Sequence, residues 1–120
     1  MVFRRLEYIK GNPNLSQKGQ EKLFDEIIPI IEIVPIGRYK YKMISETAKC
    51  LSNSNLPKEK LKDYFEKLIE IACKISNKNY KRKAICSILK CLRDTLDLEK
   101  DNLFKDLVDK CLKEIVVYYT

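Results

Sequence analysis

Histidine and tryptophan are absent from this 120-residue chain, and glycine occurs only three times. Histidine is the commonest general base and a frequent metal ligand, so the usual catalytic and metal-binding constellations lack a central component. The glycine-rich phosphate loops G-x-x-x-x-G-K-[ST] and G-x-G-x-x-G are absent as well. From these absences we expect no enzyme activity, no cofactor and no metal site.

Long apolar runs are also absent. The most apolar stretch, residues 27–36, is interrupted by Pro29, Glu32 and Pro35, whereas a membrane span needs about 20 consecutive apolar residues. Residues 1–10 include basic side chains but not the apolar core of a signal peptide. We therefore expect no membrane span and no secretory signal.

What is present suits one folded domain. Apolar side chains make up 45% of the chain and charged ones 34%, a balance typical of a single soluble domain with one core. The five cysteines form an odd set that lies in segments of helical periodicity, which predicts reduced thiols in a cytoplasmic protein. Cys86 falls on a polar arc, whereas the other four are expected to pack in the core as small hydrophobes: Cys50, Cys73, Cys91 and Cys111.

An internal repeat organises the sequence. When the chain is aligned with itself at an offset of 41 residues, residues 39–51 match residues 80–92 at seven of thirteen positions. The same offset pairs apolar residues upstream, such as Phe24 with Phe65, and the first half of a third unit aligns at an offset of 39. We therefore predict one repeat domain over residues 1–120, with units at about 15–55, 56–97 and 98–120.

Each unit has the pattern of two helices. Apolar residues recur at spacings of three and four, as in Leu61, Phe65 and Leu68, which is typical of an amphipathic helix. The one strand-like signal is a β-prone tail at 115–119. Together with the proline, glycine and asparagine breaks, the pattern predicts five helices, over residues 16–34, 37–53, 57–75, 78–96 and 99–115.

A period of 41 residues with two helices is similar to HEAT and armadillo-type units, and it exceeds the TPR unit of about 34 residues. Pro29, inside the first expected helix, resembles the proline often found in the first helix of a HEAT unit. Residues 80–92, Tyr-Lys-Arg-Lys-Ala-Ile-Cys-Ser-Ile-Leu-Lys-Cys-Leu, resemble the Tyr-Arg-Ala-x-Ala-Leu-x-x-Ile-Ala-x-x-Leu run of prokaryotic HEAT-like helices. The resemblance implies an all-α, right-handed α-α superhelix that serves as an interaction scaffold.

Two and a half repeats leave apolar surface at both ends of such an array. Two outcomes are open for the apolar segments near the termini: they fold back as caps, or they pack against a second copy of the chain as a homodimer. These segments are Val2, Phe3, Leu6, Tyr8 and Ile9 at one end and residues 115–119 at the other.

The formal net charge of +7 is unevenly distributed. Segments 37–53 and 78–96 together carry +8, whereas the other three expected helices together carry −2. Equivalent helices lie side by side in an α-solenoid, and the resemblance to HEAT-like arrays implies that the second helices line the concave surface. The sequence thus predicts a basic partner-binding face that includes Lys42, Lys49, Lys83, Lys90, Arg82 and Arg93.

Two kinds of partner suit a basic face: an acidic segment of another protein, or the backbone of a nucleic acid. Tyr41 lies beside the lysines, where a tyrosine ring can stack on a base, whereas Tyr39 and Tyr80 are expected to belong to the core. A row of lysines is also the ordinary solvated surface of a lysine-rich helix. Our leading interpretation is a scaffold or adaptor for an acidic protein segment, with a nucleic-acid-binding module as the alternative. A small enzyme would need a pocket that the sequence does not predict.

Overall fold

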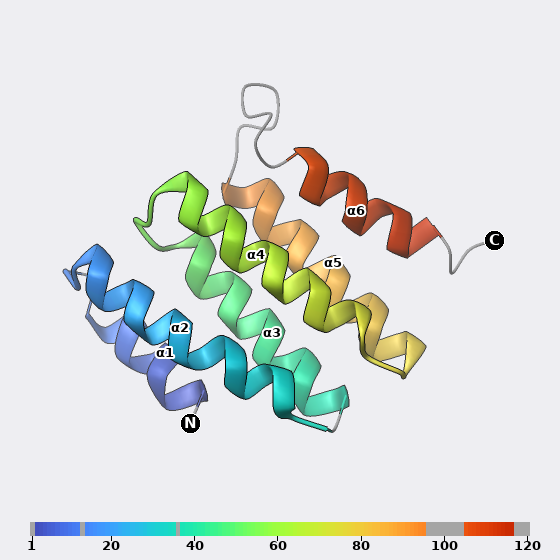
Figure 1. Ribbon diagram of the computed structural model, residues 1–120, viewed down its shortest axis with the longest axis horizontal. Helices are drawn as coiled ribbons and strands as arrows, with labels where there is room; N and C mark the ends of the chain where they lie inside the picture. Colours follow the sequence, from blue (N-terminus) through green and yellow to red (C-terminus); the bar gives the residue numbers. More distant parts are fainter. Residues whose placement is uncertain (1, 13, 36, 96–104, 117–120) are drawn as a thin grey trace.

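The computed structural model describes residues 2–12, 14–35, 37–95 and 105–116, and these residues form six α-helices and no strand (Figure 1). None of the described helices combines the length and the apolar content that a bilayer span requires. The helices are α1 (Val2–Gly11), α2 (Gln17–Ile33), α3 (Gly37–Ser52), α4 (Lys58–Cys73), α5 (Lys78–Thr95) and α6 (Lys105–Val116).

Local capping residues explain where α2 and α5 begin. The Ser16 hydroxyl accepts a hydrogen bond from the Gly19 N–H at 3.1 Å before α2, and the Asn77 side chain accepts one from the Tyr80 N–H at 3.1 Å before α5. Such side chains satisfy N–H groups that have no partner inside the helix. The expected bounds of α2, α3, α4 and α5, which rest on such local signals and on proline, glycine and asparagine breaks, lie within two residues of those observed.

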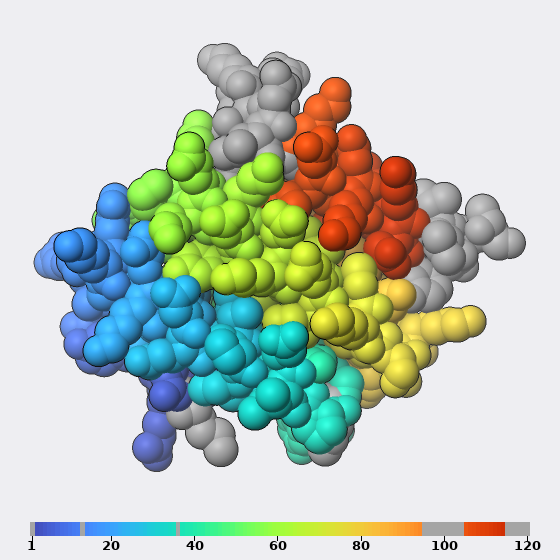
Figure 2. All heavy atoms as spheres, viewed as in Figure 1, coloured from blue at the N-terminus to red at the C-terminus, as the bar shows by residue number. Residues whose placement is uncertain are grey.

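The helices form two layers of three. In one layer α3 packs between α1 and α5, and in the other α4 packs between α2 and α6. Consecutive helices run antiparallel (Figure 1). The principal extents are 45 × 37 × 17 Å, and the shortest is that of two packed helix layers. Figure 2 shows the face covered by α2, α4 and α6, so the layer of α1, α3 and α5 forms the opposite face.

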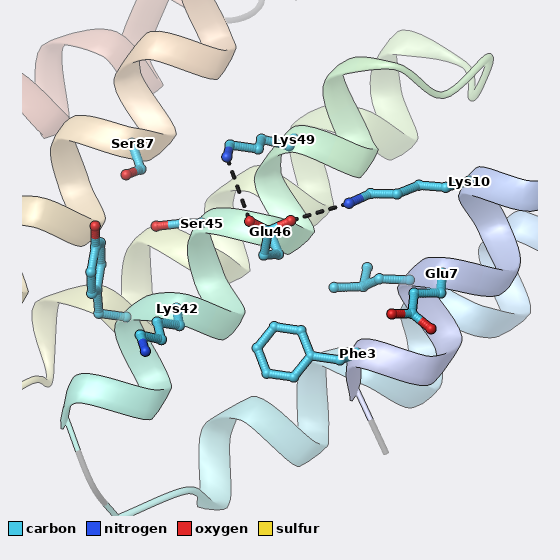
Figure 3. A pocket seen from close by; sticks show the side chains of 10 residues that line it. Phe3, Glu7, Lys10, Lys42, Ser45, Glu46, Lys49 and Ser87 are labelled. Carbon is cyan, nitrogen blue, oxygen red and sulfur yellow. Dashed lines mark hydrogen bonds and ion pairs between the residues drawn. The ribbon is translucent and has the colours of Figure 1, made fainter.

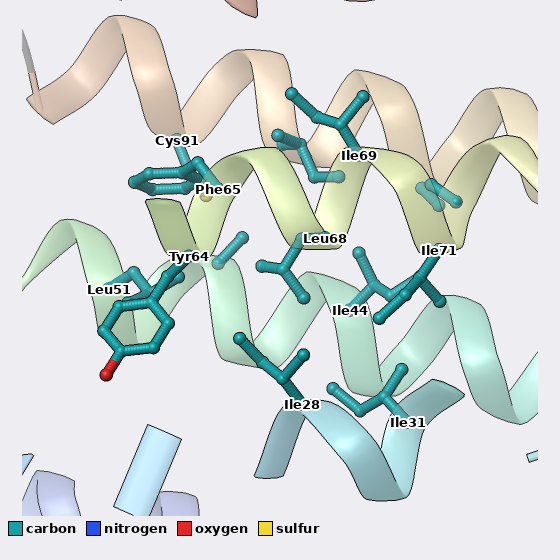
Figure 4. Packing of buried hydrophobic residues seen from close by; sticks show 14 of the residues in the cluster. Ile28, Ile31, Ile44, Leu51, Tyr64, Phe65, Leu68, Ile69, Ile71 and Cys91 are labelled. Carbon is teal, nitrogen blue, oxygen red and sulfur yellow. The ribbon is translucent and has the colours of Figure 1, made fainter. Parts of the chain in front are cut away.

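The core lies between the layers. Phe24 of α2 and Phe65 of α4 are among the largest fully buried side chains. Leu68 of α4, Ile44 of α3 and Ile31 of α2 direct their aliphatic side chains into the same space (Figure 4). Burial of apolar area from three successive helices supplies the main driving force for this packing.

Tyr64 adds a polar link between α2 and α4. Its side chain is 3% exposed, and its hydroxyl donates a hydrogen bond to the Asp25 carboxylate at 2.8 Å. Its ring also lies 5.6 Å from the Phe24 ring, centroid to centroid. Burial, together with the hydrogen bond to Asp25, raises the pKa of Tyr64 well above its ordinary value, so the group remains a neutral donor.

The expectation of five helices is wrong, because α1 is a sixth helix. Val2 and Leu6 are 1% and 2% exposed, and α1 packs against α2 and α3. The N-terminal segment therefore folds back on its own chain, while Phe3 and Tyr8 remain exposed. Helix α1 was not expected because this short helix lies outside the repeat alignment and has only three buried positions.

At the other end, α6 packs against α4 and α5 and buries Leu107 and Cys111. Residues 99–104 of the expected last helix lie outside the described residues, as do residues 117–119 of the expected β-prone tail. Residue 115 ends the expected helix and is helical as expected, and residue 116 continues α6, so the β-prone signal does not form a strand at these two positions.

The 41-residue offset pairs α2 with α4 and α3 with α5, and in each case the two paired helices are in contact. Matched core positions have the same burial: Ile44 and Ile85 are both 0% exposed, as are Leu51 and Leu92. The six helices pack as a compact two-layer, all-α structure. Its description as a right-handed HEAT-like superhelix remains a prediction.

Candidate functional site

A groove follows α3 on the layer of α1, α3 and α5 (Figure 3). Its first hollow, of about 420 Å³, is lined by Phe3, Leu6, Glu7, Lys10, Tyr41, Lys42, Ser45, Glu46, Lys49 and Ser87. Its second, of about 480 Å³, is lined by Lys49, Ser52, Asn53, Ser87, Lys90, Cys91 and Asp94. Because Lys49 and Ser87 line both hollows, the two adjoin, and together they are called the α3 groove below.

Half of the predicted basic residues line this groove. Lys42 and Lys49 lie two turns apart on α3, and Lys90 of α5 shares the second hollow with Lys49. Lys83, Arg82 and Arg93 are on α5 as well, but none of them belongs to the described lining of either hollow. The Lys83 ammonium instead lies 5.8 Å from the centre of the Tyr80 ring, and Arg82 is half-buried.

Glu46 holds two of the groove lysines in place. Its carboxylate oxygens lie 3.2 Å from Lys10 Nζ and 3.5 Å from Lys49 Nζ (Figure 3). Partial burial raises the pKa of Glu46, but the hydrogen bonds and charges of the two lysines outweigh it and leave the pKa below its ordinary value. The hydrogen bond to Glu46 in turn raises the pKa of Lys10. Both partners are therefore charged at neutral pH.

The groove as a whole has mixed charge. The two hollows are lined by four lysines, Lys10, Lys42, Lys49 and Lys90. Three carboxylates lie among these lysines: Glu7, Glu46 and Asp94. The net excess of positive charge inside the groove is therefore much smaller than the sum over whole helices suggests. A ligand meets separate positive positions rather than a continuous basic strip.

Sequence reasoning missed the contribution of α1. Phe3, Glu7 and Lys10 all come from this helix, and all three line the first hollow. The available signal was the helical spacing of Val2, Leu6 and Ile9, which places Phe3, Glu7 and Lys10 away from the buried side of a helix. That spacing gives no information on which other helix α1 contacts.

The tyrosines beside the lysines take different positions from those expected. Tyr39 is 45% exposed, with the Arg38 guanidinium 5.6 Å from the centre of its ring, so the expectation that it belongs to the core is wrong. Tyr80 is half-buried and packs against the core. Its ring stacks on that of Tyr41 with centroids 6.1 Å apart, so each of these two rings has one face already covered.

The cysteines lie close to where the helical pattern places them. Cys50, Cys91 and Cys111 are buried, Cys73 is half-buried, and Cys86 is exposed. Burial is the main cause that raises the pKa of Cys111 to about 12, so this thiol is a poor nucleophile at neutral pH. Within the described residues no group of three or more acidic, cysteine or histidine side chains is arranged to hold a metal ion.

No protein-family model matches this chain, and neither a curated protein nor a solved structure does. The interpretation of the α3 groove therefore rests on its own chemistry. It offers ammonium groups, carboxylates, the hydroxyl of Ser87, and one exposed aromatic ring at Phe3. These groups make ion pairs, hydrogen bonds and apolar contacts with a ligand.

Proposed function

We propose that this chain is a small, non-catalytic interaction module of the cytoplasm, HEAT-like in architecture, that binds an acidic segment of a partner protein along the α3 groove. The observation that supports this most directly is the placement of Lys42, Lys49 and Lys90 along one hollowed surface. All three residues are exposed, so a carboxylate reaches them from solvent, and at Lys49 it shares the ammonium with Glu46.

The mixed charge of the groove favours a protein segment over a nucleic acid. A nucleic-acid backbone carries a phosphate at every nucleotide, and it would have to pass Glu7, Glu46 and Asp94. A protein segment places its acidic residues only where a lysine stands. Base stacking on Tyr41 and Tyr80 is also restricted, because the two rings stack on each other.

The test is binding of a fluorescent synthetic peptide of alternating glutamate and serine, followed by anisotropy. The variant Lys42→Glu/Lys49→Glu/Lys90→Glu should bind it about 3- to 100-fold more weakly, since each of the three exposed ion pairs contributes about 0.2–1 kcal/mol. The matched control, Lys22→Glu/Lys60→Glu/Lys113→Glu, makes the same change in net charge at exposed lysines of the other layer. It should keep most of the affinity.

Equal losses in the two triple variants would mean that the peptide responds to net charge alone and not to the groove. No measurable binding to the unmodified protein would also overturn the proposal. A mixed-sequence single-stranded oligonucleotide is measured in parallel over a range of salt concentration. If it binds more tightly than the peptide and loses affinity only in the groove variant, the nucleic-acid alternative replaces the proposal.

A further inference from the structure

Phe3 is an aromatic side chain left uncovered inside a charged groove. It is 41% exposed even though its neighbours Val2 and Leu6 on α1 are buried. Its ring extends from α1 toward α3 on the side of Lys42 (Figure 3). Tyr8, the other exposed aromatic residue of α1, is 54% exposed and lies outside the groove, beside Arg4 and Leu23. Phe3 thus gives the first hollow an apolar wall that the charge pattern does not account for.

A purely acidic ligand makes poor use of this wall. It would leave the Phe3 ring in contact with water and would bring carboxylates close to Glu7 and Glu46. An apolar side chain in the same place covers the ring, removes apolar area from water and adds no charge beside those carboxylates. The first hollow therefore favours an apolar group, and the lysines at its ends favour acidic ones.

The spacing of the lysines leaves room for both kinds of group. Lys42 and Lys49 are two helical turns apart, which is about 10 Å along α3. In an extended peptide, residues i, i+2 and i+4 point to the same face and together span about 13 Å, and the long lysine side chains bridge the small difference from the spacing along α3. One bulky side chain fits between two acidic residues that reach Lys42 at one end and Lys49 with Lys90 at the other.

We propose that the partner segment is acidic with one bulky apolar residue at its centre, and that this residue packs on Phe3 while flanking carboxylates pair with Lys42, Lys49 and Lys90. This inference rests on the proposed function and specifies its ligand. The occupant is a segment of another protein, because the charge pattern and the apolar wall are complementary to a peptide of mixed character.

The experiment compares two peptides that differ in one residue: the glutamate–serine peptide with a central leucine, and the same peptide with alanine there. The leucine peptide should bind the unmodified protein about three- to tenfold more tightly, since that is the gain expected from a leucine that buries about half of its side chain. Phe3→Ala should abolish this difference while leaving the affinity for the alanine peptide unchanged. Tyr8→Ala, the matched control on the outer side of α1, should preserve the difference.

Phe3→Leu is the second variant, because it keeps an apolar wall and should retain most of the leucine preference if Phe3→Ala proves poorly folded. The leucine preference should also persist at high salt, where the ion pairs weaken.

Equal binding of the two peptides, or a leucine preference that survives Phe3→Ala, overturns the inference while the binding of acidic segments stands. Absence of binding by both peptides overturns the proposed function itself. Light scattering, which measures the molar mass in solution, tests whether a second copy of the chain covers the Phe3 ring instead. If the protein is a dimer that Phe3→Ala dissociates, the ring lies in a dimer interface and the inference is wrong.

Discussion

The role of α1 can be tested by the substitution Leu6→Ala. Leu6 is 2% exposed and lies where α1 meets α2 and α3. Replacing a buried leucine by alanine costs about 2–5 kcal/mol, and the cost depends on how far the surroundings relax into the cavity. Because α1 is the edge helix of its layer and can shift inward, we expect the lower part of that range, about 2–3 kcal/mol.

The destabilisation by Leu6→Ala should appear either as easier unfolding of the whole chain or as easier detachment of α1 alone. A helix as short as α1 is not stable on its own in water, so it is helical only while Val2, Leu6 and Ile9 are docked. If the chain unfolds as one unit, the urea midpoint measured by circular dichroism falls. If α1 detaches alone, trypsin cleaves faster after Arg5 while the core keeps its midpoint.

The control is Tyr8→Ala, which changes an exposed residue of the same helix and should alter the free energy of unfolding by no more than about 0.5 kcal/mol. An unchanged midpoint together with unchanged cleavage after Arg5 in Leu6→Ala would refute the reasoning. It would mean that the packing of Leu6 against α2 and α3 does not hold α1 in place. The position of Phe3 beside the α3 groove would then have no structural support.

Two further predictions concern single interactions. Tyr64→Phe removes the hydrogen bond to Asp25 and should lower the free energy of unfolding by about 1–2 kcal/mol in urea titrations, whereas the same substitution at exposed Tyr39 should have almost no effect. Glu46 has a lowered pKa, so its ion pairs stabilise the folded state above about pH 4.5 and this contribution disappears as the pH falls through the folded-state value. Glu46→Gln should accordingly lower the urea midpoint near neutral pH, by an amount equivalent to about 0.5–1 kcal/mol, and leave it unchanged at about pH 3. A midpoint difference that is the same at both pH values would assign the effect to packing rather than to charge.

The sequence by itself determined the helical elements. Local signals decide where a helix begins and which of its sides is apolar, and Ser16, Asn77 and the spacing of Leu61, Phe65 and Leu68 are such signals. The all-helical content, the four central helices and the exposure of Cys86 followed from them. The short helix α1 escaped detection because three apolar positions are too few to make a periodic pattern distinct.

Only the tertiary structure decided which charges share a surface. A count of charges along a helix treats Lys42, Lys83 and Lys90 as equivalent. Lys83 and Lys90 share one side of α5, but only Lys90 lines the groove, whereas the Lys83 ammonium lies over the Tyr80 ring. The ion pairs of Glu46 with Lys10 and Lys49, and the apolar wall of Phe3, exist because α1 docks beside α3. Contacts between residues far apart in the chain depend on how helices pack, and no local pattern encodes that geometry.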